Sequence, residues 1–352
     1  MGGMKEKMSI ITIIGAGMMG SAMVFPASDN GHEVRLVGTP LDRSHIEAVR
    51  DGKAHPTLKR KLPDPVKLYQ AEEMDEALKD ADLLIGGVSS FGVDWFGTQV
   101  IPKVREDLPV LMVTKGLVKE PDGRLASIPD TLSRKAGHPV SVNAVGGPVI
   151  SFELADRRQT LIGFGGTDMD ILRKIKALLE TSYYHISLTT DLIGFECAVA
   201  MKNAYALGVA LAIGMNEAEN GEHSPEKYNP QAALFEESTR ECRKLIRMMG
   251  GDEESIVFFA GDLYVTVFGG RTRQIGILLG RGLPFEEARE RLKGVTLESV
   301  AIARRVSEAL LSGERREYMP PEEFPLLMHI YEMICKGATV SIPWQSFEVE
   351  TM

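Results

Sequence analysis

Short apolar runs alternate with amphipathic stretches along the first half of the chain. β-branched and other apolar residues concentrate in runs bounded by turn residues, at positions 8–14, 33–37, 81–88, 109–114 and 140–145. These runs have the length and composition of buried strands. Stretches with helical spacing lie between them, at 72–79 and 99–106, and a helix of small residues follows the first run and ends at Asn30-Gly31. This alternation predicts a parallel sheet with both faces covered, the doubly wound α/β fold.

The pattern changes near residue 191. Two further strands are predicted at 158–165 and 183–188, with a helix at 168–179 between them. After Asp191 the apolar spacing is mostly helical, with turns at Gly250-Gly251, Gly269-Gly270 and Gly282. We therefore expect a Rossmann-type dinucleotide-binding domain over residues 1–190 and an all-α domain, carrying substrate-binding and catalytic groups, over residues 191–352.

Composition and charge narrow the class of protein. The 352 residues are 44% hydrophobic and 25% charged, as in globular proteins, and the length suits two domains. The formal charge of −9 argues against a nucleic-acid partner, which needs a broad basic surface. The longest apolar runs contain Lys or Glu, and the N-terminus lacks the pattern of a signal peptide. Neither a membrane span nor secretion is therefore expected.

Cysteine usage favours a reducing compartment. Cys197, Cys242 and Cys335 are far apart, odd in number and not arranged as a CxxC pair. This spacing predicts neither a disulfide framework nor a metal site, so we expect a cytoplasmic protein without a bound metal. The long apolar helices of the second half favour a homodimer.

A glycine turn follows the first predicted strand. Its sequence is Gly15-Ala16-Gly17-Met18-Met19-Gly20. The first glycine permits a tight turn, the second lets the backbone approach a pyrophosphate, and the third lets the helix pack on the sheet. Unpaired N–H groups at the helix start then face the phosphates. The same residues could form a turn without a ligand, but the strand before them and the helix after them favour a dinucleotide site.

The choice between NAD and NADP depends on the end of the second strand. An acid there would bind a ribose hydroxyl, and an arginine would accept a 2′-phosphate. Positions 37–39 contain no acid, whereas Thr39 and Arg43 can meet a phosphate. Asp42 comes later and can simply cap a helix over 43–50. The cofactor is therefore NAD or NADP, and NADP is slightly favoured.

A lysine interrupts an apolar stretch at positions 194–214. The stretch is apolar on nearly all sides, which predicts a buried central helix, and Lys202 and Asn203 lie inside it. A buried ammonium group is costly unless it is paired. Lys202 is therefore either a structural partner of Asp262 or Glu196, or a proton donor to a carbonyl oxygen. The dinucleotide site favours the proton donor.

Two further positions carry cations of interest. Lys115 follows a predicted parallel strand, at the end where ligands bind in such sheets, although an ordinary surface lysine could stand there too. Arg271 and Arg273 come directly after Gly269-Gly270. That arrangement suits the binding of a small anion, and it equally suits a solvated loop.

Seven segments of the chain match those of a known family in the family's order. They are GAGMMGSAM (15–23), HPTLKRKLP (55–63), TKGL (114–117), GGPVISFEL (146–154), GFECAVAMKNAYALGVALAIG (194–214), NPQAALFEE (229–237) and GDLYVTVFGGRTR (261–273). On these segments the chain resembles the NAD(P)-dependent glycerol-3-phosphate dehydrogenases over nearly its whole length. The resemblance implies reversible reduction of dihydroxyacetone phosphate to sn-glycerol 3-phosphate, which supplies glycerophospholipid synthesis. It also implies an all-α second domain similar to the C-terminal domain of 6-phosphogluconate dehydrogenase.

The resemblance also implies roles for individual residues. Lys202 falls on the general acid that protonates the carbonyl oxygen while C4 of the nicotinamide gives the hydride, and Lys115 and Asp262 fall on further catalytic positions. The residues implied to bind the substrate are Lys115, Asn203, Thr266, Arg271 and Thr272. Those expected to bind the cofactor are the glycine turn with Thr39, Arg43, Ser89, Arg271 and Lys293.

Three positions depart from the family pattern. Thr272 stands where the family usually has asparagine, Gly146 where it has serine, and Lys293 where a glutamate or glutamine faces the cofactor. Two alternatives therefore stay open: a related dehydrogenase acting on another keto or 2-hydroxy acid, or a non-catalytic nucleotide-sensing protein. A sensor would have no need of a buried Lys202. The segment 341–352, with Trp344 and Phe347, matches no family role.

Overall fold

The structure, a computed structural model, describes residues 8–313 and 318–348. It divides into two units. The first comprises Met1–Lys115 and Ile128–Leu192, and the second comprises Gly116–Ser127 and Ile193–Met352. The chain passes from the first unit to the second for the last time between Leu192 and Ile193, next to the boundary predicted between residues 190 and 191. That expected division did not include Gly116–Ser127, which interrupts the first unit in sequence but belongs to the second.

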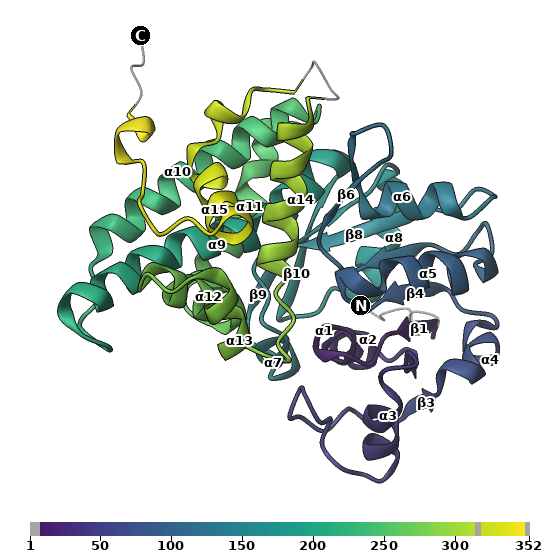
Figure 1. The fold of residues 1–352 in the computed structure, drawn as a ribbon. Helices are drawn as coiled ribbons and strands as arrows, with labels where there is room; N and C mark the ends of the chain where they lie inside the picture. Colours follow the sequence, from purple (N-terminus) through teal and green to yellow (C-terminus); the bar gives the residue numbers. More distant parts are fainter. Residues whose placement is uncertain (1–7, 314–317, 349–352) are drawn as a thin grey trace. The chain divides into compact units, whose positions relative to one another are not determined.

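A sheet of eight strands forms the centre of the first unit, counted over the described residues (Figure 1). Its strands are β1 (Ile10–Ile14), β2 (Glu33–Val37), β3 (Val66–Tyr69), β4 (Leu83–Gly86), β5 (Val110–Met112), β8 (Val142–Gly146), β9 (Thr160–Gly165) and β10 (Tyr184–Thr189). They lie in the order β10-β9-β8-β5-β4-β1-β2-β3. All neighbours pair in parallel except β8 and β9, which are antiparallel. The five strands predicted to form a parallel sheet, β1, β2, β4, β5 and β8, do so, and the antiparallel junction is where β9 joins them.

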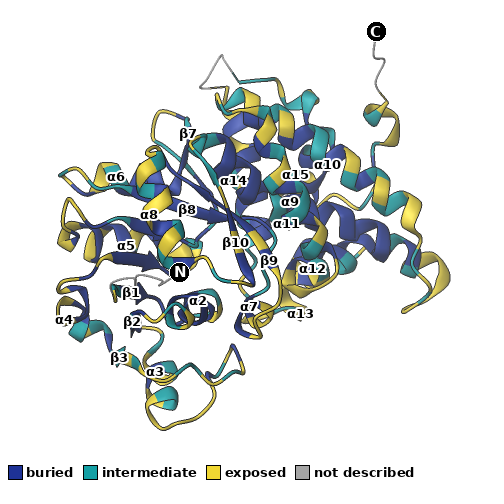
Figure 2. Cartoon of the chain, turned by 180° about the vertical axis from the view of Figure 1, so that it is seen from behind, coloured by how far each residue is buried: buried dark blue, intermediate teal, exposed yellow. Residues whose placement is uncertain are grey.

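Helices cover both faces of the sheet, as the doubly wound prediction requires. They are α1 (Met18–Ala22), α2 (Val24–Asp29), α3 (Arg43–Arg50), α4 (Met74–Leu78), α5 (Val93–Gln99), α6 (Ile128–Lys135), α7 (Ser151–Ala155) and α8 (Met169–Leu179). Helix α1 packs with α2 and α7, α2 packs with α8, and α5 packs with α6. The central strands β1 and β4 are almost completely buried (Figure 2). The glycine turn follows the carboxyl end of β1, and Ser89 comes shortly after the carboxyl end of β4.

One predicted helix is wrong and several short elements were not predicted. Positions 99–106 do not form a helix: α5 ends at Gln99 and the 3-10 turn η3 (Ile101–Lys103) follows. Pro102 lacks an N–H group and its ring obstructs the preceding turn, so it cannot sit inside a continuing helix. Strands β3, β6 (Leu117–Lys119) and β7 (Leu125–Ser127) have three or four residues. Runs of that length are too short for the period of two to stand out in the sequence.

The second unit is helical apart from the hairpin of β6 and β7. Its helices are α9 (Leu192–Asn220), α10 (Tyr228–Met248), α11 (Ile256–Val267), α12 (Gly270–Gly280), α13 (Phe285–Arg291), α14 (Glu298–Ser312) and α15 (Pro325–Lys336). Short 3-10 turns are η1 (Ala71–Glu73) and η2 (Ser90–Gly92) in the first unit and η4 (Glu253–Ser255), η5 (Pro321–Glu323) and η6 (Trp344–Phe347) in the second.

Helix α9 is the core of the second unit. It is the one described helix that is long and apolar enough to cross a membrane, although the sequence pattern had indicated none. However, 89% of its apolar window is buried within the protein. It therefore packs as a core helix, and the buried central helix predicted at 194–214 is confirmed.

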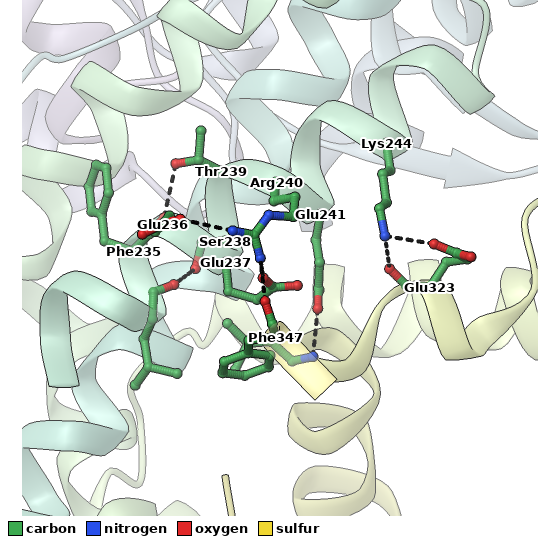
Figure 3. A network of polar contacts seen from close by, with 12 residues as sticks. Phe235, Glu236, Glu237, Ser238, Thr239, Arg240, Glu241, Lys244, Glu323 and Phe347 are labelled. Carbon is green, nitrogen blue, oxygen red and sulfur yellow. Dashed lines mark hydrogen bonds and ion pairs between the residues drawn. The ribbon is translucent and has the colours of Figure 1, made fainter. Parts of the chain in front are cut away.

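The described part of the C-terminal segment is attached to α10. Arg240 donates a hydrogen bond from Nη1 to the Phe347 carbonyl oxygen at 2.9 Å and pairs through Nη2 with Glu236 at 2.8 Å (Figure 3). Lys244, one turn further along α10, pairs with Glu323 at 2.6 Å. The Phe347 ring packs against the helical core. These contacts give residues 341–348 a structural role that the sequence alone did not assign.

Candidate active site

The glycine turn connects β1 to α1 at the carboxyl end of the sheet. Gly15 has a φ of +115°, which side chains disfavour, and a Cβ there would lie 2.6 Å from the carbonyl carbon of Gly87. A Cβ at Gly20 would lie 2.1 Å from the Gly15 oxygen, so the start of the helix touches the turn itself. By contrast, the nearest atom to a Cβ at Gly17 is 3.9 Å away. The surface above Gly17 is therefore open to a ligand, while Gly15 and Gly20 serve close packing.

Three side chains hold the backbone of Ala16. Oδ2 of Asp42 accepts hydrogen bonds from Ala16 N at 3.1 Å, from Thr39 N at 3.0 Å and from Thr39 Oγ1 at 2.7 Å. Nδ1 of His45 and Nε2 of His55 lie 3.0 and 2.9 Å from the Ala16 oxygen. A carbonyl oxygen can only accept, so both imidazoles donate to it. The two peptide groups that flank the Ala16 Cα are thus both fixed, and with them the glycine turn.

This arrangement corrects the interpretation of Asp42 as a helix cap. Helix α3 begins at Arg43 as predicted, but Asp42 makes no side-chain capping bond to it. Its carboxylate turns to the glycine turn because two backbone N–H groups and a hydroxyl converge there. Burial lowers the pKa of His55, against the hydrogen bond to Ala16, which raises it. Sequence reasoning missed both histidines, because they reach Ala16 across 29 and 39 residues.

The other cofactor candidates lie in exposed or half-buried positions. Arg43 is exposed and pairs with Glu72 at 2.6 Å. Ser89 is exposed and comes just after β4. Lys293, in the second unit, is exposed and pairs with Glu290 at 2.8 Å. Arg43 and Lys293 thus each pair with a surface glutamate, and both side chains remain accessible to an anionic ligand.

A buried ion pair joins α9 to α11 in the second unit. Nζ of Lys202 lies 2.7 Å from Oδ1 of Asp262 and 3.1 Å from Oγ1 of Thr266. Asp262 is fully buried, and the Lys202 side chain is 13% exposed. Thr266 donates its own hydroxyl hydrogen to the Asp262 carbonyl oxygen at 2.7 Å, one turn earlier on α11. Asp262 is one of the two partners that the sequence predicts for Lys202. The Lys202 side chain stays partly exposed in this pair.

The geometry of this pair leaves one donor of Lys202 available. An ammonium group has three N–H donors. Within the described residues, Asp262 and Thr266 take two of them. The third can therefore serve a ligand oxygen, and the partly exposed side chain gives it access to that ligand. Asn203, the next residue on α9, is half-buried.

The two arginines at the start of α12 differ in their contacts. Arg273 donates to the Val267 carbonyl oxygen at 2.9 Å and pairs with Glu226 at 2.7 Å, so it holds the α11–α12 turn. Arg271 is exposed and makes no hydrogen bond or ion pair in the described part of the chain. Thr272 is buried. Of these residues, Arg271 is the cation that an anion can reach.

Glycines fix α12 against α9. A Cβ at Gly276 would lie 2.6 Å from the Leu207 oxygen, and one at Gly280 would lie 2.2 Å from the Leu211 oxygen. A Cβ at Gly214, on α9 itself, would lie 2.1 Å from the Ile277 oxygen. The two backbones are therefore in direct contact, and this contact sets the register between the helix of Lys202 and the helix of Arg271.

Lys115 lies beyond the end of β5, as the sequence predicts. Its Nζ donates to the Gly147 carbonyl oxygen at 3.1 Å, and its side chain is half-buried. Gly147 follows β8, which pairs in parallel with β5. Lys115 and Gly147 thus share the carboxyl edge of the sheet, where ligands bind in doubly wound folds.

This combination defines a class of protein. A doubly wound sheet with an open glycine turn after its first strand, followed by a helical unit with a buried lysine–carboxylate pair, is the architecture of a nicotinamide-dependent dehydrogenase. Family models described as the N-terminus and the C-terminus of NAD-dependent glycerol-3-phosphate dehydrogenase match residues 10–171 and 191–344. The chain belongs to this family.

Individual relatives agree with the family match. The chain is 33% identical over 287 residues to the NADP(+)-dependent glycerol-3-phosphate dehydrogenase of Archaeoglobus fulgidus, covering 81% of this chain and 84% of the relative. It is 27% identical over 332 residues to the NAD(P)+ glycerol-3-phosphate dehydrogenase of Shewanella pealeana, covering 93% and 91%.

Two solved structures share the fold. The glycerol-3-phosphate dehydrogenase of Plasmodium falciparum matches 99% of this chain and 97% of its own, with a TM-score of 0.83 and 19% identity. That of Coxiella burnetii matches 97% of this chain and 98% of its own, with a TM-score of 0.78 and 22% identity. These likenesses confirm the mixed α/β architecture, with a Rossmann-like unit followed by a helical one.

Proposed function

We propose that this chain reduces dihydroxyacetone phosphate to sn-glycerol 3-phosphate with NAD(P)H, in a reversible reaction. Family membership gives the glycerol-3-phosphate dehydrogenase activity with NAD(P). The observation that carries the mechanism is the partly exposed ion pair of Lys202 with the fully buried Asp262. A non-catalytic nucleotide sensor would not need to keep that charge pair. Membership of the family favours a triose phosphate over a keto acid as the substrate.

Lys202 is the proton donor in this proposal. When bound, the nicotinamide supplies a hydride from its C4 to the carbonyl carbon of the substrate. The third N–H of Lys202 donates a hydrogen bond to the carbonyl oxygen and transfers its proton as negative charge develops there. Asp262 and Thr266 hold the ammonium group by the other two N–H donors, so its direction is set before the substrate binds.

Arg271 binds the substrate phosphate. Its guanidinium can donate two parallel hydrogen bonds to phosphate oxygens. The first N–H groups of α12 favour negative charge at the same end of the helix. Thr272 can add a hydroxyl and Asn203 an amide, and Lys115 adds a second positive charge to the substrate site. Arg273 is not assigned to the phosphate, because its guanidinium is already engaged with the Val267 carbonyl oxygen and is paired with the Glu226 carboxylate.

The glycine turn fits a dinucleotide pyrophosphate. The space above Gly17 is open, and the backbone N–H groups of Met18, Met19 and Gly20 begin the helix that follows. Ser89 lies at the end of β4 and can contact the same ligand, and Lys293 and Arg271 offer positive charge from the second unit. Their roles as cofactor contacts are part of this proposal.

NADP is the favoured cofactor. The one carboxylate near the end of β2, that of Asp42, is occupied by Ala16 and Thr39 and is held inward. Arg43 is exposed at the start of α3, where it can leave Glu72 for a 2′-phosphate. The similar protein from Archaeoglobus fulgidus is described as NADP(+)-dependent, which agrees with this preference.

The cellular setting is also part of the proposal. We place the protein in the cytoplasm as a homodimer that supplies sn-glycerol 3-phosphate to glycerophospholipid synthesis. A cofactor-oxidation assay with dihydroxyacetone phosphate, run separately with NADPH and NADH, tests the reaction and the cofactor together. Turnover with NADPH at a lower KM than with NADH is expected. No turnover of dihydroxyacetone phosphate with either cofactor, while a 2-keto acid is reduced, would contradict the substrate assignment.

A further inference from the structure

The hairpin Gly116–Ser127 connects the proposed active-site lysine to the second unit. Lys115 is the last residue of the first stretch of the first unit, and Gly116 already belongs to the second unit. The chain returns to the first unit only at Ile128. The main chain on the C-terminal side of Lys115 is therefore held by a different unit from the strand on its N-terminal side.

The hairpin is docked on the helical core by apolar contacts. Leu117 on β6 and Leu125 on β7 are buried in the core cluster that contains α9, α11 and α14. β6 packs along α14. An isolated two-stranded hairpin is marginally stable in water, so its order depends on this docking.

Two polar anchors complete the docking. Arg305, on α14, donates from Nη1 to the Leu117 carbonyl oxygen at 2.5 Å. The Leu125 N–H donates to the hydroxyl oxygen of Tyr318 at 2.6 Å. Each anchor holds one strand, and Leu117 is only two residues from Lys115. The Arg305 contact is thus the nearest polar fixing point on the C-terminal side of the lysine.

The N-terminal side of Lys115 is fixed within the first unit. Oγ1 of Thr114 donates to the Val88 carbonyl oxygen at 2.6 Å, and the Lys115 ammonium group donates to Gly147 at 3.1 Å. From Lys115 the chain passes only through Gly116 before it reaches Leu117, whose carbonyl oxygen Arg305 holds. The docking of the hairpin therefore fixes the path of the chain directly after Lys115.

We propose that Arg305 is a positioning residue for Lys115: by holding β6 on α14, it fixes the backbone from which the lysine reaches the substrate. This inference rests on the proposed role of Lys115 in binding the substrate. A catalytic group displaced by about 1 Å can lose up to a hundredfold in rate, so an anchor two residues away is sufficient to matter. Arg305 acts through Lys115 and touches neither substrate nor cofactor.

A double-mutant cycle on the full-length protein tests the proposal. Arg305→Met keeps the apolar stem and removes the donor, and Arg304→Met is the matched control, because Arg304 is the exposed neighbour on α14 that contacts Cys335. We expect Arg305→Met to lower kcat/KM for dihydroxyacetone phosphate about tenfold, with the Kd for NADPH unchanged and Arg304→Met within about twofold of the wild type. In a Lys115→Met background, Arg305→Met should cause no further loss, because the two residues act as one unit.

The outcomes separate this inference from the proposed function. Wild-type kcat/KM in Arg305→Met, or a double variant that loses the product of the two single effects, would overturn the positioning role and leave the assigned reaction intact. Wild-type activity of Lys115→Met would contradict the role of Lys115 itself, and would leave Arg305 nothing to position. If Arg305→Met does not fold, Tyr318→Phe removes the other anchor, and the same non-additivity with Lys115→Met is expected.

Discussion

Lys202 Nζ lies 2.7 Å from Asp262 Oδ1, and this ion pair connects the core helix α9 to α11. The carboxylate is fully buried, and a buried charge is costly unless it is paired, so the ammonium group stabilises it. The pair holds two helices together, and in the proposed mechanism it also presents a directed N–H to the substrate. The predictions below separate these roles from each other and from cofactor binding.

Removing the charge of Asp262 should impair catalysis without affecting the cofactor. Asp262→Asn keeps the size of the side chain but leaves the Lys202 ammonium group without its counter-ion and misdirected. We expect kcat to fall by about one to two orders of magnitude while the Kd for NADPH stays the same. Glu254→Gln, an exposed acid at the start of the same region, is the control. Equal kcat in Asp262→Asn and the wild type would show that the pair is structural only.

Arg271 should discriminate the phosphate of the substrate. Arg271→Ala should lower kcat/KM for dihydroxyacetone phosphate about a hundredfold, because a charge-assisted bidentate contact is lost. The loss should be much smaller for the weak reduction of unphosphorylated dihydroxyacetone, which lacks the phosphate and is affected only by the proposed cofactor contact of Arg271. Arg289→Ala, an exposed arginine on α13, serves as the control. A similar loss on both substrates would place Arg271 elsewhere in the mechanism.

Arg43 should determine the preference between the two cofactors. It is exposed at the start of α3, and Arg50 at the other end of the same helix makes a comparable ion pair with Glu73. Arg43→Ala should raise KM for NADPH about tenfold and leave KM for NADH almost unchanged, since only NADPH carries a 2′-phosphate. Arg50→Ala should change neither. A parallel rise in both KM values for Arg43→Ala would argue against a 2′-phosphate contact.

Much of this architecture follows from sequence patterns. Strand 33–37 and helix 43–50 appear at the predicted residues, because each has a clear period and clear ends. The buried helix at 194–214 and the position of Lys115 beyond a parallel strand are also found. Each of these features follows from the residues of one short segment, so it can be predicted from the sequence of that segment.

What the sequence does not show are contacts that depend on the assembled fold. His45 and His55 reach Ala16 only once the loops after β2 meet the glycine turn, and nothing in their local sequence indicates it. Asp42 stands at the position of a helix cap, but its carboxylate accepts hydrogen bonds from the N–H groups of Ala16 and Thr39 instead. The hairpin 116–127 joins the second unit through Leu117 and Leu125, whose short strands resemble an ordinary loop.

Glu241 should make the stability of the helical unit depend on pH. This buried carboxyl group accepts hydrogen bonds from the N–H groups of Leu326 and Leu327, at the start of α15, and from Tyr205. Burial raises the pKa of Glu241 to about 8, although these hydrogen bonds lower it. An acid whose pKa is higher in the folded than in the unfolded protein stabilises the fold fully at low pH, and that stabilisation is lost as the pH rises through 8.

Denaturant unfolding at a series of pH values checks this. Glu241→Gln cannot ionise, so its free energy of unfolding should fall less steeply than that of the wild type as the pH rises from the usual glutamate range to 8. The variant is also expected to be less stable at every pH, because its amide nitrogen cannot accept the backbone N–H bonds. Glu236→Gln, exposed on the same helix, should retain the wild-type slope. Equal slopes for Glu241→Gln and the wild type would contradict the prediction.

The role of Lys202 as proton donor is tested most directly by kcat for the reduction of dihydroxyacetone phosphate by Lys202→Met, measured together with the Kd for NADPH. The variant removes the ammonium group and keeps an apolar stem in the core. We predict that kcat falls by about a hundredfold or more, as for removal of a general acid, while NADPH binding is retained. A kcat close to that of the wild type would contradict the assignment of Lys202.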